Sequence, residues 1–396
     1  MTKQLTTALL LILLITPCLT NAQKKELSQA RSIIKSGNDY GRAEELMKGL
    51  LKDSTNKDNE KIYLLWFEAV RGQYNQANER LYLKQNQDTA AFFNLNRRMF
   101  TILETLDSID MRPDKKGRVD IEYRQKHAEI LNVYRPNLFN AGTFHLRKGE
   151  YQTAYEYFEQ YIDCDNQPLF TGRDYLHKDN KMKEAAYWAT YAAYKMNDAV
   201  LTLRHRHMAL NDSAKANFTL QYIAEARRWL NDKELYVKAL EEGFNRYPTF
   251  SYFFPRLIDA YSQEGELEKA LQVTDKAIEA CDTCSLYYFA KSTILLRLGR
   301  YQDCIDVCKR LLSFCPELAE VYFNAGTSYI NLALELNERK DKKKIRQLYQ
   351  EALPYMEQYR RLAPKELEKW GSPLYRIYFN LNMGKQFDEI DRLLKQ

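Results

Sequence analysis

The sequence repeats with a period of about 34 residues through much of its second half. Four successive segments begin at the same interval, without a gap, at Asn217, Ser251, Ser285 and Ala319. Self-similarity at such a fixed interval is typical of arrays in which each unit packs on its neighbours. We therefore expect stacked repeats over this part of the chain.

The composition indicates that these repeats are helical. The 396 residues include only 14 glycines and 10 prolines, roughly half of the average usage of about 7% and 5%. Valine occurs only eight times, whereas a parallel sheet needs buried strands rich in valine and isoleucine, separated by turns with glycine. The sequence therefore predicts an all-α fold.

Corresponding positions of several repeats carry the residue types that a helical hairpin needs. The first helix ends at a residue that tolerates positive φ, the two helices cross at a small side chain, and a proline ends the unit. These residues are Gly149, Asn231, Gly265 and Gly299 at the turn, Ala154, Ala270, Cys304 and Ala352 at the crossing, and Pro248, Pro316 and Pro364 at the end.

At these positions the chain resembles the tetratricopeptide repeat (TPR) family, whose motif of small, aromatic and glycine positions has the same period of about 34 residues. The match to the motif is specific over about 217–364 and good at 135–165. The resemblance implies a right-handed α-solenoid of stacked hairpins whose first helices line a concave groove. Further motif positions are occupied by Gly142, Tyr151, Phe158, Ile258, Tyr261, Gly326 and Tyr329.

The predicted organisation follows these repeats and the linkers between them. A polar segment at 112–118, with Pro113 and Gly117, gives a soft boundary. We expect a signal peptide at 1–22, a divergent TPR-like helical region at 23–111, irregular hairpins at 119–216 with a loop insert at 166–183, and a regular array at 217–396. The array divides into 217–250, 251–284, 285–318, 319–366 with an insertion near 337–344, and a capping hairpin at 367–396.

Two local features distinguish the last repeats from the others. About 14 residues are inserted between Tyr329 and Ala352 relative to the repeat pattern, and such insertions usually extend both helices of a hairpin or loop out from one face. In the capping hairpin, Ser372 and Pro373 predict an N-cap and a first-turn proline.

Residues 1–22 have the pattern of a secretory signal peptide. Lys3 supplies the positive charge, residues 8–15 the apolar stretch, and Ala22 the small residue before cleavage. The apolar stretch is shorter than the roughly 20 residues of a membrane-spanning helix, so we expect no integral membrane span. Cys18 follows Pro17, a poor match to a lipoprotein signal. We therefore expect an exported protein, periplasmic or associated with the cell envelope, without lipid anchoring at Cys18.

Cysteines cluster in the regular repeats. Cys281 and Cys284 form a C-x-x-C pair, which could close a local disulfide, remain as free thiols, or serve redox or metal chemistry. Cys304 and Cys308 are spaced i,i+4 on one helix. That spacing suits a metal, but it also describes two small packing residues, and we favour the packing interpretation.

The sequence carries no motif of a catalytic, cofactor or metal centre. His205 and His207 would point about 200° apart on a helix, and no phosphate loop, nucleophile elbow or HExxH is present. The formal charge of +6 is spread along the chain, so we expect no nucleic-acid partner. The sequence predicts a protein that is not an enzyme and uses no cofactor or metal.

The TPR resemblance implies which side chains face the concave groove, and aromatic and arginine anchors among polar groups suit a peptide. We therefore expect a non-catalytic scaffold that holds a protein or peptide partner in an envelope-associated assembly. The candidate groove residues are Tyr222, Arg228, Trp229, Tyr252, Arg256, Asp259, Gln263, Phe289, Arg297, Asn324 and Asn331.

Two alternatives remain open. The 29 tyrosines and four tryptophans could serve a carbohydrate-binding or transport-accessory protein, in which Trp188 or Trp229 would be an exposed platform. A scaffold predicts instead that the tryptophans are mostly buried. A weaker alternative is a thiol-redox helper that acts through Cys281 and Cys284.

Overall fold

The computed structural model describes residues 23–114 and 116–395, and within these ranges the regular structure is helical, with no strand. The predicted all-α fold is confirmed. The expected signal peptide, including Cys18, lies outside the described residues. No described helix is both long and apolar enough to cross a membrane. The chain forms two compact units, Met1–Leu230 (unit 1) and Asn231–Gln396 (unit 2).

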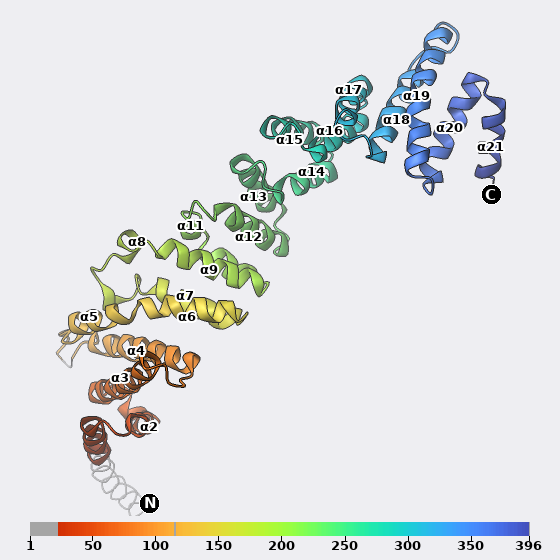
Figure 1. The fold of residues 1–396 in the computed structure, drawn as a ribbon. Helices are drawn as coiled ribbons and strands as arrows, with labels where there is room; N and C mark the ends of the chain where they lie inside the picture. The colour runs from red at the N-terminus through yellow and green to blue at the C-terminus, as the bar shows by residue number, and fades with distance from the viewer. Residues whose placement is uncertain (1–22, 115, 396) are drawn as a thin grey trace, which may run out of the picture. The chain divides into compact units, whose positions relative to one another are not determined.

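Unit 1 consists of helices that pack in chain order, with α2 on α3, α3 on α4, α6 on α7 and α7 on α9 (Figure 1). A helical segment at 23–36 precedes them. The elements are α2 (Tyr40–Leu50), η1 (Ser54–Asn56), α3 (Glu60–Tyr82), α4 (Thr89–Asp110), α5 (Arg124–Tyr134), α6 (Pro136–Arg147), α7 (Tyr151–Asp163), η2 (Pro168–Phe170), α8 (Tyr175–Lys178), α9 (Met182–Lys195), α10 (Ala199–Arg204), α11 (Arg206–Ala209) and α12 (Ala216–Trp229).

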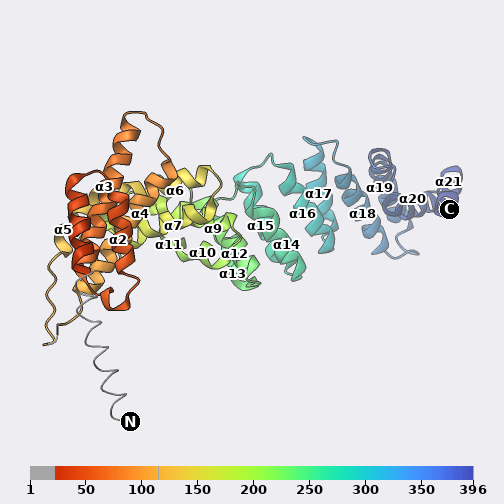
Figure 2. The same ribbon diagram turned by 90° about the horizontal axis from the view of Figure 1, so that it is seen from below.

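The irregularity of unit 1 begins with the long hairpin of α3 and α4, whose turn projects beyond the neighbouring helices (Figure 2). Asn59 and Asp88 start the two helices, since each side chain accepts a hydrogen bond from a backbone N–H of the first turn. Glycine permits close contact with α2: a Cβ atom on Gly72 would lie 2.3 Å from the ring of Tyr40.

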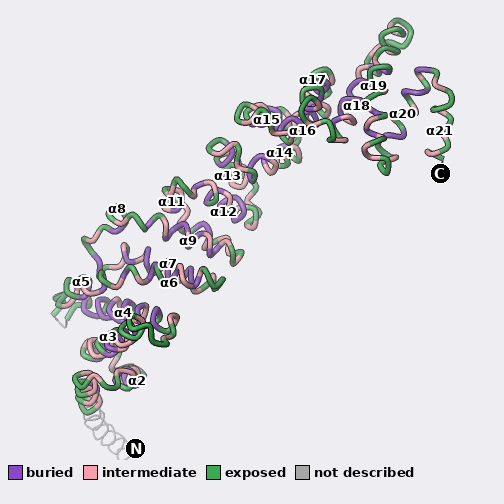
Figure 3. The backbone as a smooth tube through the Cα atoms, viewed as in Figure 1, coloured by how far each residue is buried: buried purple, intermediate pink, exposed green. Residues whose placement is uncertain are grey.

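One cluster of buried side chains extends from Tyr63 on α3 to Tyr222 on α12. It includes Leu131 of α5 and Phe170 of the insert, so helices on both sides of the 112–118 segment share a core (Figure 3). The structure therefore differs from the soft boundary expected there, because a surface turn joins helices that pack together. The compact units divide instead at residues 230 and 231, inside the first repeat of the expected regular array.

Unit 2 is the regular part. Its second helices α13, α15 and α17 begin at Lys233, Leu267 and Tyr301, which reproduces the fixed interval of the sequence repeat. Gly265 and Gly299 end the preceding helices at φ of 75° and 74°, as a helical hairpin requires. The elements are α13 (Lys233–Arg246), α14 (Phe253–Gln263), α15 (Leu267–Ala280), α16 (Ser285–Arg297), α17 (Tyr301–Leu312), α18 (Ala319–Leu334), α19 (Lys342–Leu362), α20 (Leu367–Leu381) and α21 (Gly384–Leu394).

Small residues lie where the helices of unit 2 cross. Ala270, Cys304 and Ala352 are fully buried, as the hairpin pattern predicts. The inserted residues extend both helices of one hairpin: α18 has 16 residues and α19 has 21, whereas α16 and α17 have 13 and 12.

The predicted helix start at Ser372 and Pro373 is wrong. Both residues lie inside α20, which begins at Leu367. The helix starts one to two turns earlier because Trp370, 4% exposed, packs into the core of the last hairpins and Leu367 packs against it.

Candidate functional site

The predicted groove residues occupy three kinds of environment and lie in both units. Arg228, Asp259, Gln263 and Arg297 are exposed. The half-buried ones are Trp229, Arg256, Phe289 and Asn331, and the buried ones are Tyr222, Tyr252 and Asn324.

Asn324 shows why a motif position alone does not identify a binding residue. Its Nδ2 donates to Ser292 Oγ at 3.0 Å and to Thr293 Oγ1 at 3.1 Å, which joins α18 to α16. Only 5% of Asn324 is exposed. Its amide therefore stabilises the stack and is not available to a ligand.

Within unit 1, two of the predicted residues belong to a chain of aromatic rings on α7, α9 and α12. We call this chain the aromatic strip. On α9 the rings are spaced three or four residues apart, which places them on one side of the helix. The members of the aromatic strip are Tyr151, Tyr187, Trp188, Tyr191, Tyr194, Tyr222 and Trp229.

The rings of the aromatic strip contact one another directly. Tyr194 stacks on Tyr222 with ring centroids 4.5 Å apart, and on Trp229 at 5.6 Å. Tyr191 lies 5.8 Å from Tyr222 and 6.3 Å from Tyr151, which continues the chain to α7. Each such pair contributes about 0.5–1.5 kcal/mol beyond area burial, so the strip is a rigid surface.

The strip combines buried and accessible rings. Tyr187 and Tyr222 are buried, whereas Trp188, Tyr191 and Trp229 are half-buried. Burial raises the pKa of Tyr222 above its ordinary value, and the neighbouring Tyr187 hydroxyl raises it further. Both hydroxyls therefore remain protonated and able to donate hydrogen bonds.

Two lysines border the aromatic strip. Lys215 Nζ lies 4.9 Å from the ring centre of Tyr187 and 4.8 Å from that of Trp188. Lys195 Nζ lies 5.7 Å from the ring centre of Tyr151. The carboxylate of Glu184 accepts a hydrogen bond from Trp188 Nε1 at 3.3 Å. Lys215 also pairs with Glu184 and Asp212 at 3.6 Å each, so Lys195 supplies the positive charge beside the rings that no described carboxylate pairs with.

The tryptophans are neither mostly buried, as predicted for a scaffold, nor fully exposed, as predicted for a carbohydrate-binding protein. Trp370 is buried, and Trp66, Trp188 and Trp229 are half-buried. Trp229 stacks on Tyr194 and Lys215 covers Trp188. Neither ring is fully open to solvent, because a neighbouring side chain covers part of each.

The cysteines of the described residues are free thiols. Cys281 ends α15 and Cys284 caps α16, and both are half-buried. Cys304 and Cys308 are buried with sulfur atoms 4.0 Å apart, and the Cys304 thiol donates to the carbonyl of Ser292 at 3.2 Å. These two are packing residues.

No cluster of three or more potential metal ligands occurs among the described residues. His205 instead pairs with Glu159, its Nε2 lying 2.5 Å from the carboxylate. This contact joins α7 to the segment after α10.

The sequence named Tyr222 and Trp229 as groove candidates and Trp188 or Trp229 as a platform for a sugar, but it assigned neither role to Tyr151, Tyr187, Tyr191 or Tyr194. The signal for the last three was present in the Tyr- and Ala-rich run at 185–194, where the tyrosines recur at helical spacing. The repeat pattern does not show that α9 and α12 bring these rings together.

No family model matches the chain, and a search of curated proteins finds no match. The chain is similar to solved TPR structures. The C-terminal part of a TPR repeat-containing protein from Cytophaga hutchinsonii has 14% identity and a TM-score of 0.42, covering 64% of this chain and 92% of that one. A TPR repeats protein from Bacteroides fragilis has 16% identity and a TM-score of 0.33, covering 65% and 98%. YrrB, described as a TPR protein with an unusual peptide-binding site, has 13% identity and a TM-score of 0.37, covering 50% and 96%.

Proposed function

We propose that the protein is an exported, non-catalytic scaffold that binds an extended segment of a partner protein along the aromatic strip. The observation that carries the proposal is the unbroken chain of ring contacts from Tyr151 through Tyr191 and Tyr222 to Tyr194 and Trp229. A helical repeat array can present such a surface rigidly, without any catalytic step.

The geometry of the strip favours a peptide. Large rings that are already ordered lose little entropy on binding, and tyrosine and tryptophan dominate the energetics of protein interfaces. Trp188 and Tyr191 are half-buried, so their accessible parts can contact apolar or proline side chains, as in grooves that bind extended peptides. Lys195 at the border favours a partner segment that carries negative charge, whereas Lys215 already pairs with Glu184 and Asp212 at 3.6 Å each.

Carbohydrate binding is the second candidate because the same tyrosine and tryptophan rings could also bind a sugar. A sugar stacks on an open ring face. The rings of Tyr222 and Trp229 both stack on the ring of Tyr194, so its faces are already in contact with other rings. The peptide proposal is therefore preferred. The thiol-redox alternative gains no support from Cys281 and Cys284, which are half-buried free thiols.

Export to the periplasm or cell envelope is part of the proposal and rests on the residue pattern of 1–22. It determines where the partner must be sought. Western blotting of fractionated cells checks it: we expect a mature chain, shortened by about 22 residues, in the envelope fraction. A full-length chain in the cytoplasm would contradict export.

The binding test uses a photo-reactive amino acid at position 191 in the full-length protein, expressed in its own cells. We expect a cross-linked protein whose yield falls at least fivefold when Trp188 and Tyr194 are both replaced by alanine. The matched control places the probe at Tyr82, which is 86% exposed at the end of α3 and far along the chain from the strip.

Equal cross-linking from positions 191 and 82, or a yield that the double substitution leaves unchanged, would contradict the peptide proposal. A titration of tryptophan fluorescence with soluble glycans separates the second candidate. Quenching by a glycan that is lost in Trp188→Phe, without any protein cross-link, would favour carbohydrate binding.

A further inference from the structure

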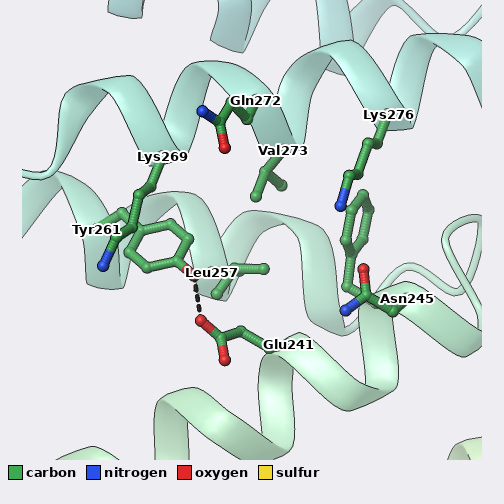
Figure 4. A pocket seen from close by; sticks show the side chains of 9 residues that line it. Glu241, Asn245, Leu257, Tyr261, Lys269, Gln272, Val273 and Lys276 are labelled. Atoms are coloured by element: carbon green, nitrogen blue, oxygen red, sulfur yellow. Dashed lines mark hydrogen bonds between the residues drawn. The ribbon is translucent and has the colours of Figure 1, made fainter.

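A small cavity opens between α13, α14 and α15 of unit 2, with a volume of about 240 Å³ (Figure 4). We call it the α13–α15 pocket. Pockets for cofactors and drug-sized ligands measure about 300–1,000 Å³. The α13–α15 pocket is therefore the size for a single side chain and not for a whole cofactor.

The floor of the pocket is apolar. Phe244 of α13, Leu257 of α14 and Val273 of α15 line it and are 2%, 1% and 8% exposed. Three helices thus fix the floor, which a small apolar side chain can contact from the open side of the pocket.

One end of the rim carries hydrogen-bond donors. Lys276 of α15 and Asn245 of α13 are both exposed and point toward each other across the pocket (Figure 4). Lys276 forms no ion pair with any described residue, and the Asn245 side chain makes no hydrogen bond within the same residues. This end can therefore receive a carboxylate.

At the other end of the rim, the polar side chains already have hydrogen-bond or ion-pair partners. The Tyr261 hydroxyl donates a hydrogen bond to the carboxylate of Glu241 (Figure 4). Lys269 forms an ion pair with Glu266 at 2.8 Å and lies 5.7 Å from the ring centre of Tyr261. The negative charge of Glu241 would repel a carboxylate at this end. The asymmetry directs an anionic group toward Lys276.

The α13–α15 pocket lies on a different face from the predicted groove. Leu257 and Tyr261 line the pocket, whereas Arg256, Asp259 and Gln263 are predicted for the groove. With about 100° of rotation per residue in an α-helix, the two sets lie on opposite sides of α14.

We propose that the α13–α15 pocket binds one apolar side chain of an acidic partner segment, in which the next residue carries a carboxylate. The apolar side chain occupies the floor, and the carboxylate accepts hydrogen bonds from Lys276 Nζ and, once the Asn245 amide turns its nitrogen toward Lys276 in place of the oxygen that Figure 4 shows there, from Asn245 Nδ2. This surface belongs to unit 2 and is independent of the aromatic strip, so the two proposals fail separately.

The test follows the methyl resonances of Leu257 and Val273 in the full-length protein during titration with three blocked dipeptides. These are acetyl-Leu-Glu-amide, acetyl-Leu-Gln-amide, which lacks the charge, and acetyl-Ala-Glu-amide, which lacks the apolar group. We expect the first to bind at least fivefold more tightly than either of the others. We also expect Lys276→Gln to abolish its advantage over the neutral peptide.

Lys238→Gln is the control, since Lys238 is an exposed lysine on α13 that pairs with Glu234 and does not line the pocket. It should leave the preference intact, and Asn245→Ala should weaken it. Equal binding of charged and neutral peptides would overturn the proposal. So would unchanged selectivity in Lys276→Gln, or the absence of methyl shifts up to about 10 mM peptide, which corresponds to a binding energy weaker than about 3 kcal/mol.

Discussion

Units 1 and 2 are made of the same kind of hairpin but are stabilised in different ways. Buried charged side chains occur, among the described residues, only in unit 1: they include Glu44, Asp107 and Arg135. In unit 2 the buried polar side chains of the described residues are neutral, for example Ser292 and Asn324. Among the described residues, buried charge is thus confined to unit 1, where it occurs both in the irregular helices and at Glu225 of α12, in the repeat that begins at Asn217.

The difference teaches how a repeat tolerates irregularity. In unit 2 the small crossing residues Ala270 and Cys304 hold the same position in successive repeats, so neighbouring helices approach by the same kind of contact. In unit 1 the insert and the long α3–α4 hairpin break that spacing. Specific ionic contacts hold the helices there. Glu44, for example, binds Arg98 at 2.7 Å and Gln73 at 2.6 Å, which ties α2 to α4 and α3.

Arg135 provides the largest expected effect. It is 4% exposed, binds Asp179 at 2.5 Å and the carbonyl of Tyr161 at 3.0 Å, and lies between the rings of Tyr161 and Tyr175. Arg135→Ala removes a buried cation that contacts both rings and leaves the half-buried Asp179 carboxylate with only the Tyr161 hydroxyl and the Lys181 N–H as donors, so the free energy of unfolding should fall by about 3 kcal/mol. Urea unfolding of the full-length protein measures the loss.

Arg360→Ala in unit 2 is the matched control. Arg360 also pairs with a carboxylate, Glu389, at 2.6 Å and also faces a ring, Trp370, but its ion pair is accessible to water. The loss should stay below about 1 kcal/mol. Equal losses in the two variants would remove the proposed difference between the units.

Gly243→Ala tests the close crossings of unit 2. A Cβ atom there would lie 2.2 Å from the ring of Phe253, which is fully buried and cannot move aside. Overpacking should outweigh the better helix propensity of alanine and cost about 1–2 kcal/mol. At Gly384 nothing lies within 4 Å of the added atom, so Gly384→Ala should be neutral in the same unfolding experiment. If neither substitution lowered the free energy of unfolding, the helix crossings would have room for an added Cβ atom, which would contradict the close packing described here.

Glu104 of unit 1 should respond to pH in the direction opposite to the ion-paired carboxylates. Burial, together with the charge of Asp163, raises its pKa to about 7. A raised pKa in the folded state gives stability that is present in acid and is lost as the pH rises through 7. Glu104→Gln should therefore stabilise the protein by about 1–2 kcal/mol at pH 8, after allowance for partial exposure, and by much less at pH 4.5. A gain that is the same at both values would exclude this cause.

The cysteines of unit 2 give the smallest expected effect. In the native protein, Cys281, Cys284 and Cys315 should react with a thiol reagent before Cys304 and Cys308, which are buried at a crossing. Cys304→Ala should cost about 1 kcal/mol for the lost contacts. Early reaction of Cys304 would mean that this crossing opens readily, and reaction of Cys281 only after reduction would indicate a disulfide with Cys284.

The sequence predicted the hairpins of unit 2 well because each crossing and each turn requires one residue type at one fixed spacing. Gly265, Gly299 and Cys304 are all placed as expected. The contacts of unit 1 were not predictable in this way. Arg135 and Asp179 are 44 residues apart, and no local pattern marks them as partners.

Candidate site residues were harder to predict than the fold. The periodic position of Asn324 places it on the first helix of its repeat, but the pattern does not show that Ser292 of the neighbouring repeat covers its amide. The α13–α15 pocket could not be predicted from the sequence for a related reason. Lys276 and Asn245 lie on second helices of successive repeats, whose outer face the motif leaves undefined.

The most direct test of the difference between the units is hydrogen exchange along the full-length chain at pH 7 and about pH 3. Hydrogen bonds from Gln73 and the charge of Arg98 hold the pKa of Glu44 below its usual value despite burial, and Tyr161 and Arg135 do the same for Asp179. A lowered pKa gives stability that is lost as the pH falls through it. After correction for intrinsic exchange, we predict that α2–α9 lose protection in acid while α14–α20 keep it. Equal loss in both units, or earlier loss in unit 2, would contradict the account.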